Sequence, residues 1–197
     1  MQSGQIKWDR IYKDRPILAS ASLVLQQNKH LLPRSGTALD IACGQGGNAV
    51  LLAESGLTVD AWDLSPVAIE QLDLIAMQKG LTIDTKVIDV MAHPLEISKF
   101  DVITVSYFLE RTLCSSIIAA LKPGGVLFYQ TYCQQKVFEQ GPTNPDYLLT
   151  DNELLTLFSG LNIRVYREEA LLGQHDQGWR NQAMLVAQKP GQTVTVR

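Results

Sequence analysis

The sequence predicts an α/β domain of the doubly wound type, in which helices cover both faces of a mostly parallel sheet. Two observations predict this class. Short apolar runs of strand length alternate along the chain with segments of helical periodicity. The first apolar run leads directly into a glycine-rich turn that opens a helix. Sheets of this type bind ligands at the carboxyl ends of their strands, so functional residues are expected there.

Seven segments are predicted as strands because they are short, largely apolar and bounded by turn-forming residues. The first, TALDIA, is a continuous apolar run that is typical of a buried parallel strand. The predicted strands are residues 37–42, 57–63, 81–89, 100–108, 126–132, 162–170 and 179–188.

The predicted helices follow from apolar periodicity and from signals at their ends. Ser65 and Pro66 form an N-cap and first-turn pair, and Gly80 ends the same helix. Thr150 and Glu153 have the spacing of a capping box. The predicted helices are residues 16–30, 49–55, 66–79, 110–121 and 150–158.

The composition excludes several classes of protein. Hydrophobic residues make up 46% of the 197 residues, enough for a sizeable core. The net charge of −3 and the lack of a basic stripe argue against a nucleic-acid binder. No apolar segment reaches the roughly 18 residues of a membrane span, and no signal peptide is visible, so a cytoplasmic location is expected. The three widely spaced cysteines predict neither a disulfide framework nor a metal site.

Three carboxylates lie at the carboxyl ends of successive predicted strands. The turn Gly44-x-Gly46-x-x-Ala49 fits a dinucleotide-binding fingerprint, and Asp63 lies 19 residues after Gly44, where a carboxylate accepts hydrogen bonds from ribose hydroxyls. Asp89 closes the third strand, where it can accept a bond from an adenine amine. Asp40 repels a pyrophosphate and suits a cation. Together they indicate an adenosine ligand with positive charge, such as S-adenosylmethionine.

Several stretches in the correct order resemble the class I S-adenosylmethionine-dependent methyltransferases. They are ALDIACGQGG, VDAWDLSP, VIDV, FDVITVSYF and LKPGGVLFYQTY, within residues 37–132. Among these enzymes the chain looks most like the small bacterial tellurite-resistance and thiopurine methyltransferases. The resemblance implies a Rossmann-like sheet of seven strands, mostly parallel with an antiparallel last strand. It also implies one domain over residues 1–197, with an N-terminal helical cap at 1–35 and an acceptor-side loop at 133–149.

The resemblance assigns the cofactor site residue by residue. Asp40 and the turn would hold the methionine part, Asp63 the ribose, and Leu64 and Asp89 the adenine. The family has glycine where this chain has Ala42, whose methyl group is tolerable if φ is negative. The implied cofactor-binding residues are Asp40, Ala42, Cys43, Gly44, Gly46, Asn48, Asp63, Leu64, Ser65, Asp89, Val90, Ser106 and Tyr107.

The acceptor side is less defined by the sequence. Similar enzymes place an aromatic N-terminal segment over the cofactor, and the pair Trp8 and Tyr12 suits that role or a simple clasp on the first helix. Arg111 either binds an anionic acceptor or pairs with Glu110. No catalytic base is assigned, because sulfur, oxygen or chalcogen nucleophiles need none. The candidate substrate-binding residues are Tyr12, Arg111, Tyr132, Tyr147 and His175.

The expected function is methyl transfer from S-adenosylmethionine to a small-molecule acceptor, such as a thiol or a chalcogen oxyanion, by a monomer or homodimer. One alternative is an NAD(P)-dependent oxidoreductase, which requires the glycine turn to hold a pyrophosphate. The other is a nucleotide-cofactor-binding module without catalysis, which binds the cofactor but turns over no acceptor.

Overall fold

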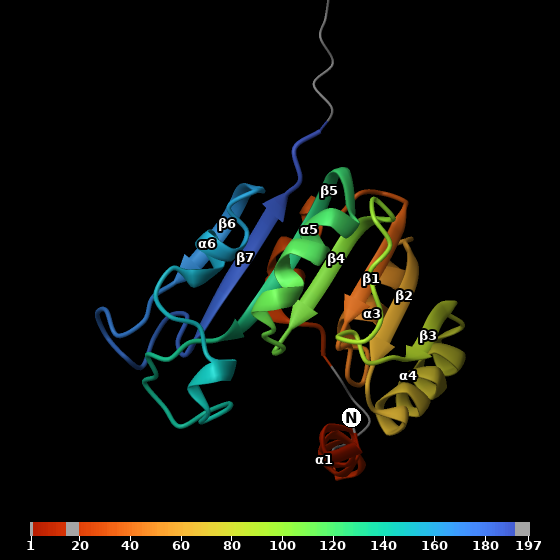
Figure 1. Ribbon diagram of the computed structural model, residues 1–197, viewed down its shortest axis with the longest axis horizontal. Helices are drawn as coiled ribbons and strands as arrows, with labels where there is room; N and C mark the ends of the chain where they lie inside the picture. The colour runs from red at the N-terminus through yellow and green to blue at the C-terminus, as the bar shows by residue number, and fades with distance from the viewer. Residues whose placement is uncertain (1, 15–19, 192–197) are drawn as a thin grey trace, which may run out of the picture.

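The structure is a computed structural model that describes residues 2–14 and 20–191. One sheet runs through it with strand order β3-β2-β1-β4-β5-β7-β6 (Figure 1). All neighbouring strands pair in parallel except β7, which is antiparallel to both β5 and β6. The predicted doubly wound, mostly parallel sheet is confirmed. The strands are β1 Thr37–Ile41, β2 Thr58–Asp63, β3 Ile83–Val87, β4 Phe100–Ser106, β5 Leu121–Tyr132, β6 Asn162–Glu168 and β7 Gln182–Gln188.

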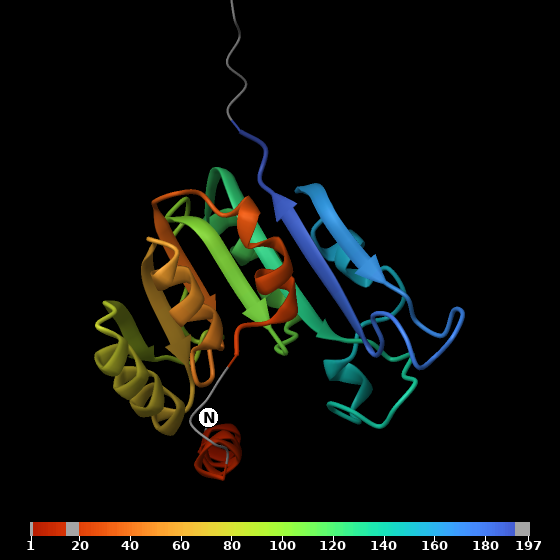
Figure 2. The same ribbon diagram turned by 180° about the vertical axis from the view of Figure 1, so that it is seen from behind.

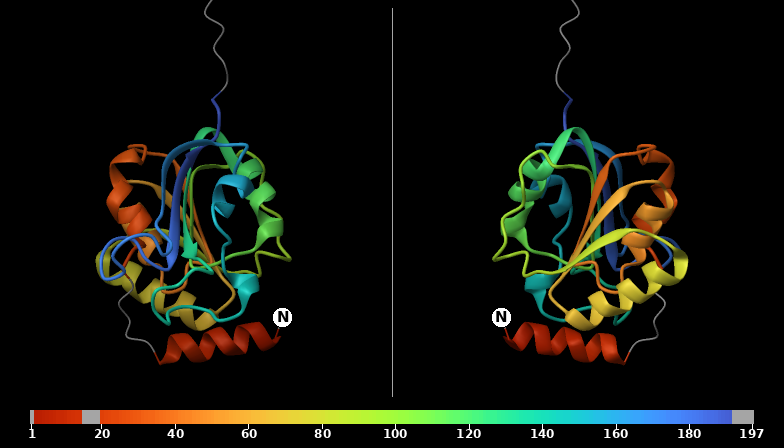
Figure 3. Two further views of the ribbon diagram at one scale, coloured as in Figure 1. Left: turned by 90° about the vertical axis from the view of Figure 1, so that its left-hand side faces the viewer. Right: turned by 90° about the vertical axis from the view of Figure 1, so that its right-hand side faces the viewer.

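Helices cover both faces of the sheet, and one lies across its carboxyl edge. Helices α2, α3 and α4 share one face, whereas α5 and α6 lie on the other (Figures 1 and 2). Helix α1 runs beneath the carboxyl ends of the strands (Figure 3). The helices are α1 Gln2–Lys13, α2 Leu23–Asn28, α3 Gly47–Glu54, α4 Pro66–Lys79, α5 Cys114–Ala120 and α6 Glu153–Leu157, with 3-10 turns η1 Lys29–Leu31, η2 Arg111–Leu113 and η3 Pro145–Tyr147.

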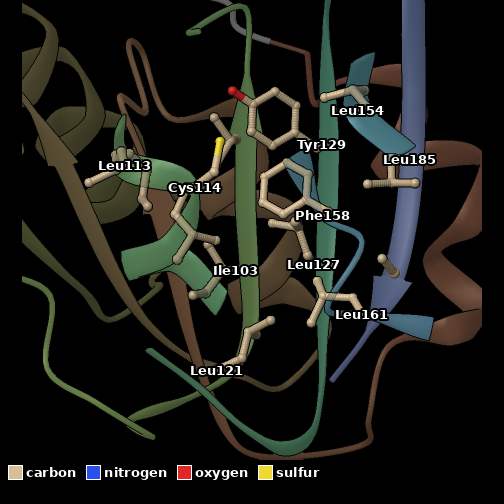
Figure 4. Packing of buried hydrophobic residues seen from close by; sticks show 14 of the residues in the cluster. Ile103, Leu113, Cys114, Leu121, Leu127, Tyr129, Leu154, Phe158, Leu161 and Leu185 are labelled. Atoms are coloured by element: carbon tan, nitrogen blue, oxygen red, sulfur yellow. The ribbon is translucent and has the colours of Figure 1, made fainter. Parts of the chain in front are cut away.

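Two hydrophobic clusters, one on each face, hold these layers together. Under α5 and α6, the ring of Tyr129 packs 5.3 Å from that of Phe158, among leucines of β5, β7 and α6 (Figure 4). Under α2, α3 and α4, Leu25, Leu52 and Leu72 are fully buried. Burial on both faces explains why the central strands are continuous apolar runs.

Local end signals place α4 as expected. The Ser65 hydroxyl accepts the Ala68 N–H, Pro66 is the first helical residue, and Gly80 ends the helix with φ +64°. Glycine adopts this left-handed conformation without a steric cost, so the helix stops there.

The first predicted helix, residues 16–30, is wrong over residues 20–22, which are not helical. Residues 15–19 lie outside the described part of the chain, and α2 begins only at Leu23. The reason is a long-range contact: the backbone N–H and the hydroxyl of Ser22 both donate to the side-chain oxygen of Asn48. This pairing holds Ser22 in an extended conformation, with ψ 149°.

Other boundaries also differ from the predictions. Strand β3 ends at Val87, so Asp89 lies beyond the strand. The helix predicted over 110–121 begins as the 3-10 turn η2. Strand β5 begins at Leu121, before the strand predicted over 126–132, and its pairing with β4 is interrupted between Leu121 and Val126.

Only the glutamate half of the capping box predicted at Thr150 forms. The Glu153 carboxylate accepts the N–H of Thr150, but α6 begins at Glu153 itself, after Asn152 with φ +59°. Glu153 also binds Arg111, which holds its side chain in a second interaction and explains the shifted start.

Candidate functional site

The glycine turn after β1 is built from left-handed backbone. Residues Ala42, Gly44 and Gly46 have φ of 52°, 54° and 79°. Gly46 caps α3, whose first backbone N–H groups are therefore turned toward the carboxyl edge. The predicted turn is confirmed, and it forms the floor of the candidate site.

The backbone of Ala42 does not have the negative φ under which its methyl group was expected to fit. A methyl group was expected to fit there if φ is negative, but φ is +52°. Left-handed backbone costs an L-residue about 1–2 kcal/mol, because its Cβ crowds the following carbonyl. The alanine is therefore a strained substitute for glycine.

We expect Ala42→Gly to raise the free energy of unfolding. Relief of the left-handed strain outweighs the greater flexibility of glycine in the unfolded chain, with a net gain of about 0.5–1 kcal/mol. Urea unfolding measures the change. Ala53→Gly, within helix α3, is the control, and it should lose about 1 kcal/mol. A loss of stability in both variants would contradict the strain at Ala42.

Asp63 joins the glycine turn to the start of α4. One carboxylate oxygen accepts the N–H of Gly44 at 2.8 Å, and the other accepts the N–H of Ser65 at 2.9 Å. The residue is 6% exposed, and this burial raises the pKa of its carboxyl. Each carboxylate oxygen accepts a further hydrogen bond when ionised, which leaves capacity for ribose hydroxyls.

Asp40 is a fully enclosed carboxylate beneath the turn. It accepts hydrogen bonds from the Thr104 hydroxyl at 2.8 Å, the Ala49 N–H at 3.1 Å and the Asn48 amide at 3.4 Å. Burial raises its pKa to about 7, and the nearby charge of Asp63 adds to the effect. A cation bound above the turn would favour its ionised form.

The titration of Asp40 makes stability depend on pH. Because its pKa in the folded protein is about 7, against 3.8 for an ordinary aspartate, the folded state holds the proton more tightly. The stabilisation is complete below about pH 4 and is lost as the pH rises through 7. We expect the free energy of unfolding to fall by about 2 kcal/mol more between pH 5 and 7 in the wild type than in Asp40→Asn. Parallel curves from urea unfolding of the two proteins would refute it.

Asn48 connects the turn to its neighbours. Its amide nitrogen donates to the Ser106 hydroxyl at 3.0 Å, and its oxygen accepts from Ser22. Ser106 ends β4, so three segments distant in sequence meet at one amide. This arrangement brings together Asp40, Asn48 and Ser106 as the resemblance implied.

The N-terminal helix covers the turn. The Tyr12 hydroxyl lies 2.8 Å from the point where a Cβ on Gly44 would stand, and the Trp8 ring stacks on Tyr12 at 5.9 Å. Asp9 accepts a hydrogen bond from Ser65, and Gln71 of α4 donates to the Tyr12 carbonyl. Helix α1 is thus held against α4 and the glycine turn, and Tyr12 lies over Gly44. This placement agrees with the expectation that the N-terminal segment covers the cofactor site.

The adenine side is only partly assembled as expected. Leu64 lies against α1, where a Cβ on Gly4 would stand 3.7 Å from its side chain. Asp89 lies in the turn after β3, where its carboxylate accepts the Met91 N–H. Val90 packs against the core cluster. The sulfur of Cys43 is buried, which raises the pKa of this thiol well above its ordinary value.

Two tyrosines meet on the opposite side of the turn. Tyr107 follows β4 with φ +59°, and its ring lies 5.2 Å from that of Tyr132 at the end of β5. The Tyr107 hydroxyl accepts a hydrogen bond of 2.7 Å from the Gln130 amide. An aromatic residue in left-handed backbone is a strained arrangement of the kind often found at functional sites.

Two of the three remaining acceptor-side candidates make contacts that hold loops in place. The Arg111 guanidinium pairs with Glu153 and donates to the carbonyls of Asp146 and Leu148, so it braces the loop 133–149. His175 is exposed and contacts the Leu171 carbonyl within the β6–β7 connection. Tyr147 is 52% exposed in η3. The structure does not bring these three side chains together.

Gln130 was missed by the sequence reasoning. It is fully buried in β5, where its oxygen accepts the Val24 N–H and its nitrogen donates to Tyr107 and Gln182. An amide within the apolar run VLFYQTY is the signal that marks it, because a buried amide requires partners.

Comparison with known proteins agrees with this geometry. Residues 38–125 match the model of a family described as methyltransferase domain. This match spans less than half of the chain, and it is a similarity to methyltransferase domains. The resemblance noted from the sequence is thereby confirmed, and S-adenosylmethionine is the methyl donor of this family.

Relatives of the methyltransferase domain differ in name. A ubiquinone biosynthesis O-methyltransferase of Histophilus somni is 36% identical over 103 residues, covering 47% of this chain and 43% of that protein. The chain thus matches less than half the length of this relative. TehB from Haemophilus influenzae has a similar structure, with TM-score 0.67, 22% identity, and coverage of 84% of this chain and 61% of TehB. A second solved structure is described as the conversion of a disulfide bond into a thioacetal group during echinomycin biosynthesis. It has TM-score 0.71 and 21% identity, and the match covers 98% of this chain and 94% of that chain.

Within the described ranges, no helix is long and apolar enough to cross a membrane. The same residues contain no group of three or more histidine, cysteine, aspartate or glutamate side chains placed to hold a metal ion.

Proposed function

We propose that the protein transfers a methyl group from S-adenosylmethionine to a small-molecule acceptor. One observation carries the proposal: the buried Asp63 carboxylate is tied to the N–H of Gly44, next to a left-handed turn over the buried Asp40. The donor set fits the cofactor, because a carboxylate suits ribose hydroxyls and a second negative charge suits a sulfonium and an ammonium. A pyrophosphate would meet two carboxylates instead of cations.

The chain's own residues bind and orient the reactants. Asp63 would hold the ribose, Asp40 would favour positive charge above the turn, and Leu64 would contact the adenine. Helix α1, through Tyr12, would exclude water from the cofactor. The cofactor supplies an activated methyl group, so the protein's task is alignment of the acceptor with it. No residue is assigned as a general base.

The acceptor is proposed to carry a sulfur or oxygen nucleophile. This agrees with the names of the relatives, which include O-methyltransferases and a structure concerned with thioacetal formation. The TehB likeness keeps a chalcogen oxyanion as a second candidate. We further propose that the protein acts as a monomer or homodimer in the cytoplasm, without a nucleic-acid or membrane partner.

Two measurements test this function. Calorimetry with S-adenosylhomocysteine and with NADH determines the cofactor, and labelled S-adenosylmethionine with a panel of thiols, phenols, selenite and tellurite detects transfer. We expect binding of S-adenosylhomocysteine only, and transfer to at least one acceptor. Tight binding of NADH alone would favour the oxidoreductase. Cofactor binding without transfer to any acceptor would favour a binding module.

A further inference from the structure

A hollow lies on the face of the sheet covered by α2. It has a volume of about 210 Å³ and lies between the start of α2, the loop 133–149 and the β6–β7 connection. Figure 2 shows α2 and this connection on the viewer's side of the sheet. We call it the Trp179 cavity, and its principal lining residues are Leu23, Phe138, Trp179, Arg180 and Gln182.

Most of the surface exposed in the Trp179 cavity is apolar, although Leu23, Phe138 and Trp179 share the lining with Asp176, Gln177, Arg180 and Gln182. Leu23 and Phe138 are 44% and 52% exposed, which is unusual for large apolar side chains at one spot. Trp179 is 6% exposed, and its indole N–H has no hydrogen-bond partner among the described residues. Apolar walls with a small number of polar groups are typical of small-molecule sites.

The charged groups at the cavity do not favour an anion. The Arg180 guanidinium donates to the carbonyls of Gln177 and Gln174 at 2.6 Å each, and to that of Ala170 at 3.0 Å. It is thus engaged in holding the β6–β7 connection together. The Asp176 carboxylate also lines the cavity and would repel an anion. The lining therefore favours an uncharged ligand.

One amide connects the Trp179 cavity to the carboxyl end of β4. Gln130 donates from its single nitrogen to the Tyr107 hydroxyl at 2.7 Å and to the Gln182 oxygen at 2.8 Å. Its oxygen accepts the N–H of Val24, the neighbour of Leu23. Because Gln130 donates to the Tyr107 hydroxyl, the proton of that hydroxyl points to another acceptor. Gln130 thus links Gln182, which lines the cavity, to Tyr107, one of the implied cofactor-binding residues.

The wall carrying Phe138 is fixed in place by Asn181. The Asn181 side chain accepts the N–H of Val137 at 2.7 Å and donates to the Phe138 carbonyl at 2.9 Å, while its backbone carbonyl accepts the Cys133 N–H. Asn181 is 1% exposed. The loop 133–149 is therefore attached to the start of β7, and the cavity is formed in advance of binding.

We propose that the Trp179 cavity binds the body of the methyl acceptor, and that this acceptor is an uncharged aromatic thiol or phenol. The proposal rests on the proposed function. Phe138 and Trp179 would contact the ring, and Gln182, which lines the cavity and is held by Gln130, would orient the nucleophile. In the transfer, a lone pair on the acceptor's sulfur or oxygen forms a bond to the methyl carbon. The bond from that carbon to the sulfonium breaks, its electron pair stays on the cofactor sulfur, and the acceptor's proton passes to water.

The test uses phenylmethanethiol and catechol as uncharged probes and tellurite as the anionic probe. Leu23→Trp fills the cavity from an exposed position, and Leu74→Trp on α4, where the leucine is 48% exposed, is the matched control. Calorimetry on the complex with S-adenosylhomocysteine gives the affinity of each probe, and labelled S-adenosylmethionine gives transfer.

We expect at least one uncharged probe to bind the wild type and to be methylated. Leu23→Trp should weaken its binding at least tenfold and leave the affinity for S-adenosylhomocysteine within twofold, and Leu74→Trp should change neither. The proposal is overturned if neither uncharged probe binds, if Leu23→Trp binds them as the wild type does, or if tellurite alone is methylated. In those cases S-adenosylhomocysteine still binds, whereas its failure to bind would remove the proposed function and this assignment with it.

Discussion

Asp63→Ala is expected to weaken the binding of S-adenosylhomocysteine by about 10-fold to 100-fold, the equivalent of about 1–3 kcal/mol for a lost charged hydrogen bond. The carboxylate is the group proposed to hold the ribose. It also accepts the N–H groups of Gly44 and Ser65, so its removal leaves two backbone donors without their partner and loosens the turn. Both effects weaken binding. Calorimetry on the purified proteins measures the affinity.

A variant on the same strand separates binding from stability. Asp60 also lies on β2, but it faces Lys99 at 3.6 Å, away from the carboxyl edge. Asp60→Ala is expected to leave the affinity for S-adenosylhomocysteine within twofold. Thermal unfolding of both variants shows how much of the loss comes from destabilisation. Equal affinities for wild type and Asp63→Ala would remove Asp63 from the site.

The structure confirms those features of the fold that depend on residues close together in the sequence. The ends of α4 follow from Ser65, Pro66 and Gly80, each of which acts within one helical turn. The strands follow from apolar runs whose burial requires helices on both faces. The position of Asp63 beside Gly44 follows from the general geometry of parallel sheets.

Features that depend on distant partners were missed. Ser22 is held out of α2 by Asn48, 26 residues later, and this contact has no local signature. Arg111 was expected to bind either an anionic acceptor or Glu110. Its actual partner is Glu153, 42 residues away. The left-handed backbone of Ala42 and Tyr107 is likewise imposed by the surrounding sheet, because neither residue type favours it.

The candidate acceptor side depends even more on contacts between residues that are distant in the sequence. Gln130 comes from β5, whereas Trp179 and Asn181 come from the connection before β7, and nothing in the sequence places Gln130 near the other two. The antiparallel pairing of β7 with β5 brings Gln182 opposite Tyr132 and so assembles the Trp179 cavity. The order of strands, rather than any motif, creates this part of the molecule.

Gly46→Ala is expected to lower the free energy of unfolding by about 2–4 kcal/mol. Gly46 has φ +79°, and a Cβ there would lie 2.7 Å from Cδ2 and 2.8 Å from Cγ of Leu72, a fully buried side chain of α4. The substitution therefore combines left-handed strain with overpacking between the turn and α4. Urea unfolding measures the loss.

Two further variants separate these contributions to the loss at Gly46. Gly80 has φ +64° but open space around it, so Gly80→Ala carries backbone strain alone and should cost about 1 kcal/mol. Adding Gly46→Ala to a Leu72→Ala background, where the clash is absent, should also cost only about 1 kcal/mol. If Gly46→Ala costs no more than Gly80→Ala in the wild-type background, Leu72 does not pack against the turn, and the close approach of α4 to the cofactor floor is wrong.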